Sequence, residues 1–280
     1  MALPNYNYTH FTTTSPAPFV AHVEINRPTK LNTFTRDMWL EFGALFGRLS
    51  HDPDVRAVVL SGAGEKAFCA GLDVKAAAAD GQRAADGKDI GRAATALRRY
   101  IKDFQGAISK MEECEKPVIC VLHGISIGLA IDIACCTDVR FASQDTNFAV
   151  KEVDIGLAAD IGTLARLPKI VGSTSWVKDV CLTARNFSAE EALGAGFVSR
   201  VLGSKAEAVG KAVELASSLA AKSPVAVQGT KEILNHARDH SVQENLRYTA
   251  VWNAAMMQSQ DFITGLKGAM SKKKPTFEKL

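Results

Sequence analysis

Three acidic residues stand in the middle of the chain, and two of them, Asp132 and Asp160, lie in apolar surroundings. Asp132 is followed by Ile133 and Ala134, Glu152 follows later in the chain, and Asp160 comes directly after a Leu-Ala-Ala run. A carboxylate in apolar surroundings is costly unless it is paired or functional, and crowding raises the pKa of at least one member. The pattern predicts general acid–base chemistry. Two alternatives stay open: Asp132 caps or bridges inside the core, and Asp160 only caps a helix over 161–167.

Two glycine-containing turns before Glu152 and Asp160 are candidates for backbone donors. In segment 67–74 (AFCAGLDV), Leu72 would present its N–H from the turn after Gly71. Segment 123–130 (HGISIGLA) is a strand-to-helix turn, and a helix N-terminus there leaves N–H groups unpaired. Either turn taken alone is more often structural. Both together, in this order, predict two N–H donors that converge on one point as an oxyanion hole.

The elements that must position these groups alternate between strands and helices. Continuous apolar runs, as expected of strands covered on both faces, predict strands over 20–25, 55–61, 117–123 and 139–142. Helical spacing predicts helices over 35–46, with Thr35 as the N-cap, over 94–111, and from 127 through 134. Repeated β-turn-α units of this kind indicate an α/β fold with a mostly parallel sheet between helices.

The character of the chain changes after about residue 172. We place a boundary near residue 186, between an α/β core with the active site (1–186) and a helical C-terminal region (187–280). Ser188 and Glu191 have the spacing of a capping box at a helix start. Segment 76–87 (AAAADGQRAADG) is interpreted as a mobile surface loop. Because the C-terminal helices lack a compact core of their own, we expect them to pack on a neighbouring subunit.

The composition excludes several classes of function. Of 280 residues, 47% are hydrophobic and 22% charged, and the net charge is +3, which argues against nucleic acid or an anionic membrane as the main partner. No apolar run is long enough for a membrane span. The six cysteines form no zinc-like pattern, and we expect Cys135 and Cys136 to be buried reduced thiols. Gly62-Ala63-Gly64 lacks the Gly-Lys-Ser of a phosphate loop.

The chain resembles the crotonase (enoyl-CoA hydratase/isomerase) superfamily over roughly residues 15–270. The likeness lies in Asn26-Arg27-Pro28 with Asn32, and in AFCAGLDV, KPVICVLHG, DVRF and SAEEALGAGFVSRV. It implies a crotonase-like fold of repeated ββα units with a helical C-terminal oligomerisation region, assembled as a trimer or a dimer of trimers. It also implies that the N–H groups of Leu72 and Leu129 hold the thioester oxygen. One departure is Gly128-Leu129-Ala130, where many relatives have three glycines, so Leu129 needs room for its side chain.

The acids favour one branch of the superfamily. Enoyl-CoA hydratases usually have glutamates at the positions of Asp132 and Glu152, whereas segment 151–169 resembles dienoyl-CoA isomerases. That resemblance implies that Glu152 and Asp160 are the proton-transfer pair and that Asp132 lies beside them. The reaction would convert a 3,5-dienoyl-CoA into the 2,4-isomer in fatty-acid β-oxidation, with Glu152 as base at C2 and Asp160 as acid at C6, or the reverse. No metal and no cofactor is expected, because coenzyme A belongs to the substrate.

The remaining expectations concern the substrate, the compartment and rival functions. The resemblance places coenzyme A near Arg27, Lys30 and Leu31, and we extend the substrate-binding set to Ala70, Gly71, Asp73 and Gly128; the alternative is that Arg27 and Lys30 are solvated turn charges. The terminal Glu278-Lys279-Leu280 resembles the peroxisomal Ser-Lys-Leu tripeptide, with a mitochondrial or cytosolic location as the alternative. Rival functions are enoyl-CoA hydration, a 3-to-2-enoyl shift, and a non-catalytic RNA-binding or scaffold role.

Overall fold

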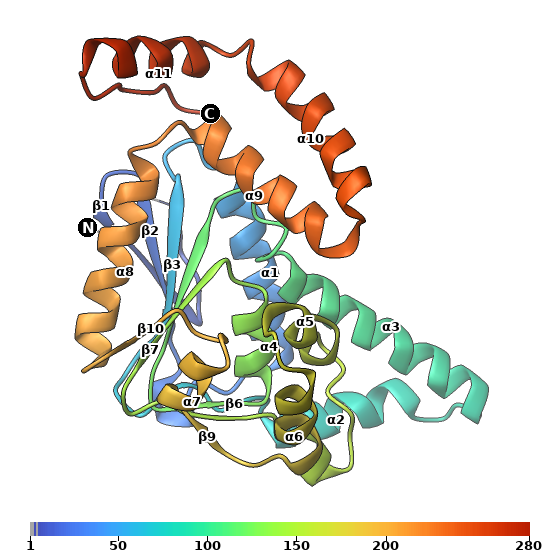
Figure 1. Cartoon of the computed structure of the whole chain (residues 1–280). Helices are drawn as coiled ribbons and strands as arrows, with labels where there is room; N and C mark the ends of the chain where they lie inside the picture. The colour runs from blue at the N-terminus through green and yellow to red at the C-terminus, as the bar shows by residue number, and fades with distance from the viewer. Residues whose placement is uncertain (1–2, 4) are drawn as a thin grey trace.

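The computed structural model describes residue 3 and residues 5–280. Figure 1 shows a large sheet, a smaller sheet below it, and helices around both. The strands are β1 (Phe11–Ala17), β2 (Val20–Ile25), β3 (Ala57–Gly62), β4 (Ala67–Cys69), β5 (Val118–Leu122), β6 (Ile125–Ile127), β7 (Val139–Ser143), β8 (Asn147–Ala149), β9 (Phe187–Ser188) and β10 (Arg200–Leu202). The helices are α1 (Arg36–His51), α2 (Val74–Ala85), α3 (Ile90–Ser109), α4 (Leu129–Cys135), α5 (Thr163–Ile170), α6 (Thr174–Thr183), α7 (Ala189–Gly194), α8 (Lys205–Ala220), α9 (Pro224–Asp239), α10 (Val242–Met256) and α11 (Gln260–Ser271), with short 3-10 turns η1 (Pro28–Lys30) and η2 (Glu152–Ile155).

The two sheets are built from the same repeating unit. The six-stranded sheet has the order β1-β2-β3-β5-β7-β10, and the four-stranded sheet has the order β4-β6-β8-β9. In β3-β4-α2 and β5-β6-α4, the first strand joins the large sheet, the second joins the small sheet, and a helix follows. Pairing is parallel except in β1–β2 and β8–β9. These repeats confirm the predicted α/β fold of ββα units.

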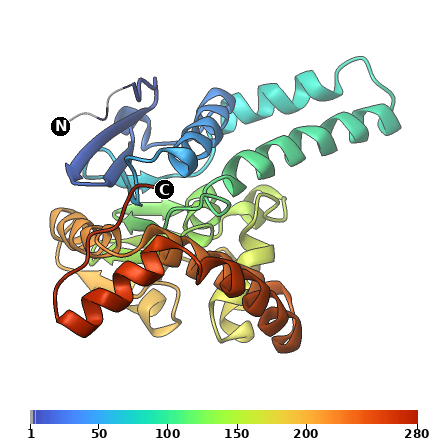
Figure 2. The same ribbon diagram turned by 90° about the horizontal axis from the view of Figure 1, so that it is seen from above.

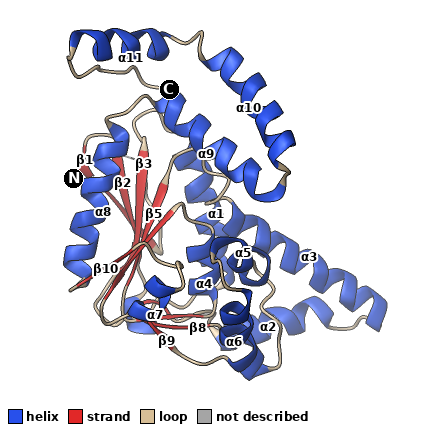
Figure 3. Ribbon diagram, in the orientation of Figure 1, coloured by secondary structure: helices blue, strands red, loops and turns tan. Residues whose placement is uncertain are grey.

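Helices cover both faces of the large sheet (Figure 3). On one face, α8 presents a stripe of alanines at four-residue spacing to Val59, Val121 and Phe141. Small side chains there let the helix lie close to the strands, and all of its stripe is buried: Ala208, Ala212, Ala216 and Ala220. The main core lies on the other face, where α1 packs its buried aromatic residues. This double cover explains why the central strands are apolar without alternation.

The predicted strands are all present, with ends shifted by up to two residues. Six strands were not predicted: β1, β4, β6, β8, β9 and β10. Of these, β1 pairs with β2, although the Thr-rich segment 11–17 carries little apolar signal. The helix expected from residue 127 begins later, at Leu129, because residues 125–127 form β6. The helices expected over 35–46 and 94–111 are α1 and α3. Thr35 is the N-cap residue of α1, but its side chain makes no capping hydrogen bond.

The prediction of a loop over residues 76–87 is wrong. These residues belong mostly to α2, which starts at Val74 with Asp73 as its N-cap; Oδ1 of Asp73 accepts a hydrogen bond from the N–H of Ala76 (3.3 Å). Alanine has the highest helix propensity, so an alanine-rich run after a capping aspartate favours a helix. Figures 1 and 2 show that α2 and α3 form a hairpin that projects from the body of the molecule.

The C-terminal region begins with strands and continues as helices. β9 and β10 follow residue 186 and join the small and the large sheet, and helices α8 to α11 come after them. Only half of the expected capping box at Ser188 forms. Its Oγ accepts from the N–H of Glu191 (3.1 Å), but the Glu191 carboxylate pairs with Arg185 and Trp176 instead. Among the described residues, no helix is long and apolar enough to cross a membrane.

Candidate active site

The three predicted acids lie on adjoining elements on one side of the small sheet. Asp132 is on α4, Glu152 is the first residue of η2, and Asp160 lies between η2 and α5. They differ in burial: Asp132 is 2% exposed, whereas Glu152 and Asp160 are half-buried. Their electrostatic interactions with one another show that the structure brings the three carboxyl groups into one neighbourhood.

Asp132 is held by the start of α5. Its Oδ1 accepts two hydrogen bonds from Thr163, one from the backbone N–H (2.6 Å) and one from the hydroxyl (2.8 Å). Burial raises the pKa of Asp132 to about 7, the Thr163 donors oppose this, and the charges of Glu152 and Asp160 add to it. This contact agrees with the alternative in which Asp132 caps inside the core, because its carboxylate accepts from the N–H at the start of α5. The same contact satisfies one of the N–H groups that every helix start leaves unpaired.

Glu152 has one enclosed oxygen without a partner. Its Oε2 is buried and accepts no hydrogen bond from any residue that the structure describes. Burial raises the pKa of the Glu152 carboxyl, and the charge of Asp160 adds to the increase. Its other oxygen faces the second glycine turn, since a β-carbon on Gly128 would lie 3.4 Å from Oε1. A carboxylate with raised pKa and a free oxygen is suited to accept a proton.

Asp160 does not cap a helix. The helix expected over 161–167 begins at Thr163, with Gly162 at the N-cap position, so the capping alternative for Asp160 is wrong. Burial raises the pKa of the Asp160 carboxyl. Its main chain is held from α3, where Nε2 of Gln105 donates to the Asp160 carbonyl (2.5 Å). Asp160 also lines a cavity of about 410 Å³ between α3 and α5.

The two glycine turns meet beside Glu152. Gly71 (φ +91°) and Gly128 (φ +57°) both take left-handed conformations that favour glycine. A β-carbon on Gly128 would lie 3.7 Å from the Cα of Gly71, and one on Gly71 would lie 3.9 Å from the backbone N of Leu129. This close approach of two backbones brings the predicted donor turns together.

Both predicted donors keep free N–H groups. Leu72 forms a parallel bridge with Phe34, in which the N–H of Phe34 donates to Gly71 O (3.0 Å) and that of Asp73 donates to Phe34 O (2.8 Å). Those bonds use the groups flanking Leu72, and its own N–H has no partner among the described residues. Leu129 is the first residue of α4, and its N–H is likewise unpartnered in the described chain. Its side chain finds room in the main core.

The segment predicted to hold coenzyme A packs against the first glycine turn. Leu31 (φ +52°) accepts a hydrogen bond from the N–H of Ala70 (3.0 Å), which joins the two segments. Arg27 is not a solvated charge, because its guanidinium donates to Asp73 Oδ2 (3.0 Å) and to the carbonyl of Thr33 (3.0 Å). That hydrogen bond holds the pKa of Asp73 below its usual range. Lys30 is exposed and its side chain has no partner among the residues that the structure describes, so its cation is available to a ligand.

Sequence reasoning missed the residues that hold the acids in place. Thr163 and Gln105 contact Asp132 and Asp160, and Arg166 anchors α5 by donating to Glu112 Oε2 (2.7 Å). In the sequence they are an ordinary helix start and two helix-surface residues, so no signal singled them out. The described residues include no group of three His, Cys, Asp or Glu side chains arranged to hold a metal ion.

Comparisons with known proteins place the chain in a family. The profile of the enoyl-CoA hydratase/isomerase family matches residues 17–279. A mitochondrial Delta(3,5)-Delta(2,4)-dienoyl-CoA isomerase of Rattus norvegicus is 46% identical over 279 residues, covering 99% of this chain and 85% of that protein. A peroxisomal protein of the same name from Arabidopsis thaliana is 43% identical over 261 residues, with 93% of each chain covered.

Solved structures agree with this placement. The crystal structure of a putative enoyl-CoA hydratase from Streptomyces coelicolor matches with a TM-score of 0.87 at 27% identity, covering 99% of this chain and 97% of that one. An enoyl-CoA hydratase from Bacillus anthracis has a TM-score of 0.86 at 24% identity, with 96% and 99% covered, and shares the fold. The chain therefore belongs to the enoyl-CoA hydratase/isomerase family, the crotonase superfamily that its motifs resemble.

Proposed function

We propose that this protein is a dienoyl-CoA isomerase of fatty-acid β-oxidation that converts 3,5-dienoyl-CoA into 2,4-dienoyl-CoA. The observation that carries the proposal is the grouping of Glu152, Asp160 and Asp132, all with raised pKa values, beside two converging turns with free N–H groups. The relatives from rat and Arabidopsis that bear this name support it.

In the proposed reaction, the thioester oxygen accepts hydrogen bonds from the N–H groups of Leu72 and Leu129. Glu152 removes a proton from C2, and the negative charge spreads from the oxygen over the conjugated chain as a trienolate. Asp160 delivers a proton to C6, which leaves double bonds at C2 and C4. Each oxyanion donor typically contributes roughly 2.7–4 kcal/mol to transition-state stabilisation. The opposite assignment of base and acid has the same balance of atoms.

Coenzyme A would lie along the segment that carries Lys30 and Leu31, next to Ala70 and Gly71. Lys30 offers an exposed cation for a phosphate, while Arg27 and Asp73 keep the turn in shape through their ion pair (3.0 Å). A Lys30→Ala variant should therefore raise KM for the acyl-CoA with little change in kcat. An unchanged KM would remove Lys30 from the binding set.

Hydration of an enoyl-CoA is the rival reaction on this scaffold. Asp132 argues against it, because enoyl-CoA hydratases usually have a glutamate at this position, whereas the shorter Asp132 is buried and bound to Thr163. Purified protein given a 3,5-dienoyl-CoA should form the 2,4-isomer without any added cofactor. Turnover of a 2-enoyl-CoA in water, with no reaction of the diene, would establish the hydratase instead.

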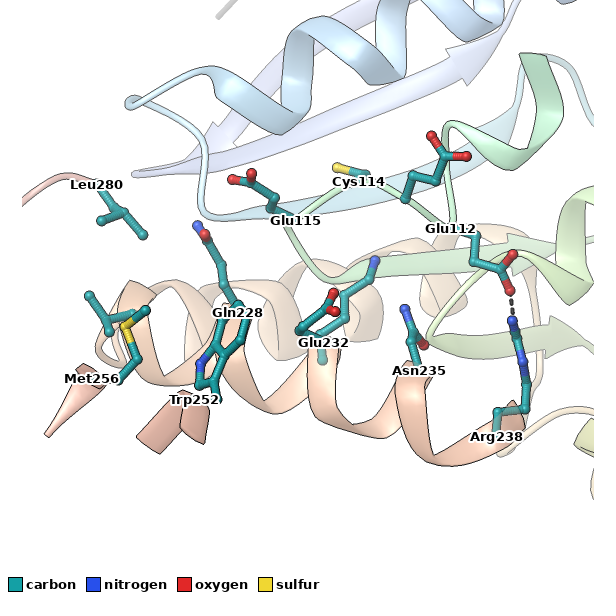
Figure 4. Close-up of a pocket in the computed structure, with 13 residues that line it drawn as sticks. Glu112, Cys114, Glu115, Gln228, Glu232, Asn235, Arg238, Trp252, Met256 and Leu280 are labelled. Atoms are coloured by element: carbon teal, nitrogen blue, oxygen red, sulfur yellow. Dashed lines mark hydrogen bonds and ion pairs between the residues drawn. The ribbon is translucent and has the colours of Figure 1, made fainter. Parts of the chain in front are cut away.

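We propose that the chain assembles with copies of itself, as a trimer or a dimer of trimers. Helices α10 and α11 leave large apolar side chains exposed: Val242, Leu246, Val251, Phe262, Leu266 and Met270. Figure 4 shows the cavity of about 580 Å³ between the 112–115 turn, α9 and α10. Gln228, Trp252 and Met256 are among the residues that line this cavity. A monomeric mass in solution would contradict the assembly.

We propose that the protein is located in the peroxisome, and the mitochondrion and the cytosol are the alternatives. Its relatives include both mitochondrial and peroxisomal proteins. The C-terminal segment lies against the body: Nη2 of Arg56 donates to the carbonyls of Phe277 and Glu278 (both 2.8 Å). A fluorescent protein carrying the last residues of this chain at its own C-terminus should enter peroxisomes. Cytosolic fluorescence would contradict the address.

A further inference from the structure

The contact between Asp132 and Thr163 joins the two helices that flank the candidate site. Both residues are buried, Asp132 at 2% exposure and Thr163 at 0%. The backbone N–H and the hydroxyl of Thr163 converge on one oxygen, Oδ1 (2.6 and 2.8 Å). Because Oδ1 accepts both bonds, a proton on this carboxyl belongs on Oδ2. Thr163 therefore fixes the orientation of the carboxyl as well as its position.

The two helices carry different parts of the proposed reaction. α4 begins at the oxyanion donor Leu129, one turn before Asp132. α5 begins at Thr163, three residues after Asp160. The Asp132–Thr163 contact is thus a short cross-link between the element that binds the thioester oxygen and the segment that carries the distal acid.

α5 is also anchored to the end of α3. Arg166 donates to Oε2 of Glu112 through Nε (3.0 Å) and Nη2 (2.7 Å), and also to the hydroxyl of Ser109 (2.9 Å). These contacts keep α5 on the end of α3 when the Thr163 hydroxyl is removed. Its first turn, which leads back to Asp160, would lose one of its two bonds to α4.

We propose that Thr163 is a positioning residue that sets which carbon of the substrate is protonated, by fixing Asp160 at the distance of C6 from the oxyanion donors. The inference rests on the proposed function, in which Asp160 is the acid. Loss of the C2 proton gives a trienolate with electron density at C2, C4 and C6. Protonation at C6 gives the 2,4-diene, protonation at C4 gives the 2,5-diene, and protonation at C2 returns the substrate. The position of the acid decides among these outcomes.

The test compares Thr163→Val with Thr163→Ser and with a control at another buried threonine. Valine keeps the shape and the backbone N–H but removes the hydroxyl, and serine restores it. Thr146 is 3% exposed, and its hydroxyl donates to the carbonyls of Leu122 and Ser143, so Thr146→Val removes a comparable buried hydroxyl outside the cross-link. Each variant receives 3,5-dienoyl-CoA in D₂O. Chromatography and NMR then measure 2,4-product, 2,5-product and deuterium at C2 of the recovered substrate.

T163V should form the 2,4-diene about 10- to 100-fold more slowly, the scale of rate loss that a misplacement of about 1 Å can cause. Deuterium exchange at C2 should persist, and 2,5-dienoyl-CoA should appear. T163S should return to within about threefold of the natural rate with the 2,4-diene as product. T146V should lower the unfolding temperature without changing the product ratio. If T163V does not fold, Thr163→Ala removes the same hydroxyl with less bulk.

Two results would overturn the inference. One is a T163V protein in which exchange and isomerisation fall equally and the 2,4-diene remains the sole product. The other is a T163V protein that behaves like the natural one. Failure of the proposed function gives a different result. If the natural protein neither exchanges the C2 proton nor isomerises the diene, the proposed function itself is wrong.

Discussion

A β-carbon on Gly128 would lie 3.4 Å from Oε1 of Glu152, so the candidate base lies next to the turn that presents an oxyanion donor. Gly128 also has a left-handed φ of +57°, and its N–H donates to the carbonyl of Ala149 on β8 (2.9 Å). The turn is therefore held by the small sheet, and its glycine leaves room for the carboxylate. This hydrogen bond joins the turn that leads to Leu129 to the segment that leads to Glu152.

A Gly128→Ala substitution should lower kcat at least about tenfold, because an L-residue is strained at φ +57° and ψ −121° and relaxation of the turn would move the Leu129 N–H. Gly196→Ala is the matched control. Gly196 has a φ of +80° and open space within 4 Å of the added carbon, so it suffers the backbone strain without any contact to the site. Both variants should lose about 1 kcal/mol of unfolding free energy. Equal kcat values in the two variants would contradict the role of the turn.

Asp160→Asn should separate the two proton transfers. The amide cannot deliver a proton to C6, so formation of 2,4-dienoyl-CoA should fall by about 10²- to 10⁴-fold. Glu152 and the oxyanion donors remain, and exchange of the C2 proton with D₂O should continue. NMR of the recovered substrate measures that exchange. Loss of C2 exchange as well as of product in this variant would instead make Asp160 the base and Glu152 the acid.

Glu152→Gln should abolish both processes, since Glu152 is the proposed base for the C2 proton. Isomerisation and C2 exchange should each fall by about 10²- to 10⁴-fold. The protein should remain folded, because Oε2 of Glu152 has no partner to lose among the described residues. Calorimetry checks this point. A variant that retains C2 exchange would show that another group is the base.

Asp132 should make the folded state less stable as the pH rises. Its pKa is about 7 in the folded chain and near 3.8 in the unfolded one, so between these values the folded state binds more protons. Stability is then fully present below about pH 4 and is lost as the pH rises to about 7. The difference corresponds to at most about 4 kcal/mol. Asp132→Asn should remove this slope in unfolding free energies measured between pH 4 and 8. An identical slope in both proteins would contradict the raised pKa.

The sequence was sufficient for features that depend on local patterns. Continuous apolar residues predicted buried strands such as 20–25 and 118–122, and the order of strands and helices predicted the α/β fold. The glycines of the two donor turns stood out because few other residues adopt their backbone conformation. The acids stood out because carboxylates are rare in apolar runs. These signals act within a few residues, so the sequence displays them directly.

The errors have physical reasons of a different kind. Segment 76–87 was interpreted as a loop from its low complexity, although its alanines and the capping Asp73 favour helix α2. The strand at 11–17 is held by pairing with β2, which the Thr-rich sequence does not show. Thr163 reaches Asp132 across 31 positions of the chain, and only the packing of α4 on α5 brings them together. Contacts of this kind leave no trace in spacing or composition.

The central claim is tested most directly by giving the purified protein a medium-chain 3,5-dienoyl-CoA with no added cofactor and following the absorbance. The 2,4-product is conjugated with the thioester and therefore absorbs at longer wavelength than the substrate. We predict that this absorbance appears at a steady rate and is lost in the Asp160→Asn variant. A protein that leaves the diene unchanged while it hydrates a 2-enoyl-CoA would contradict the account.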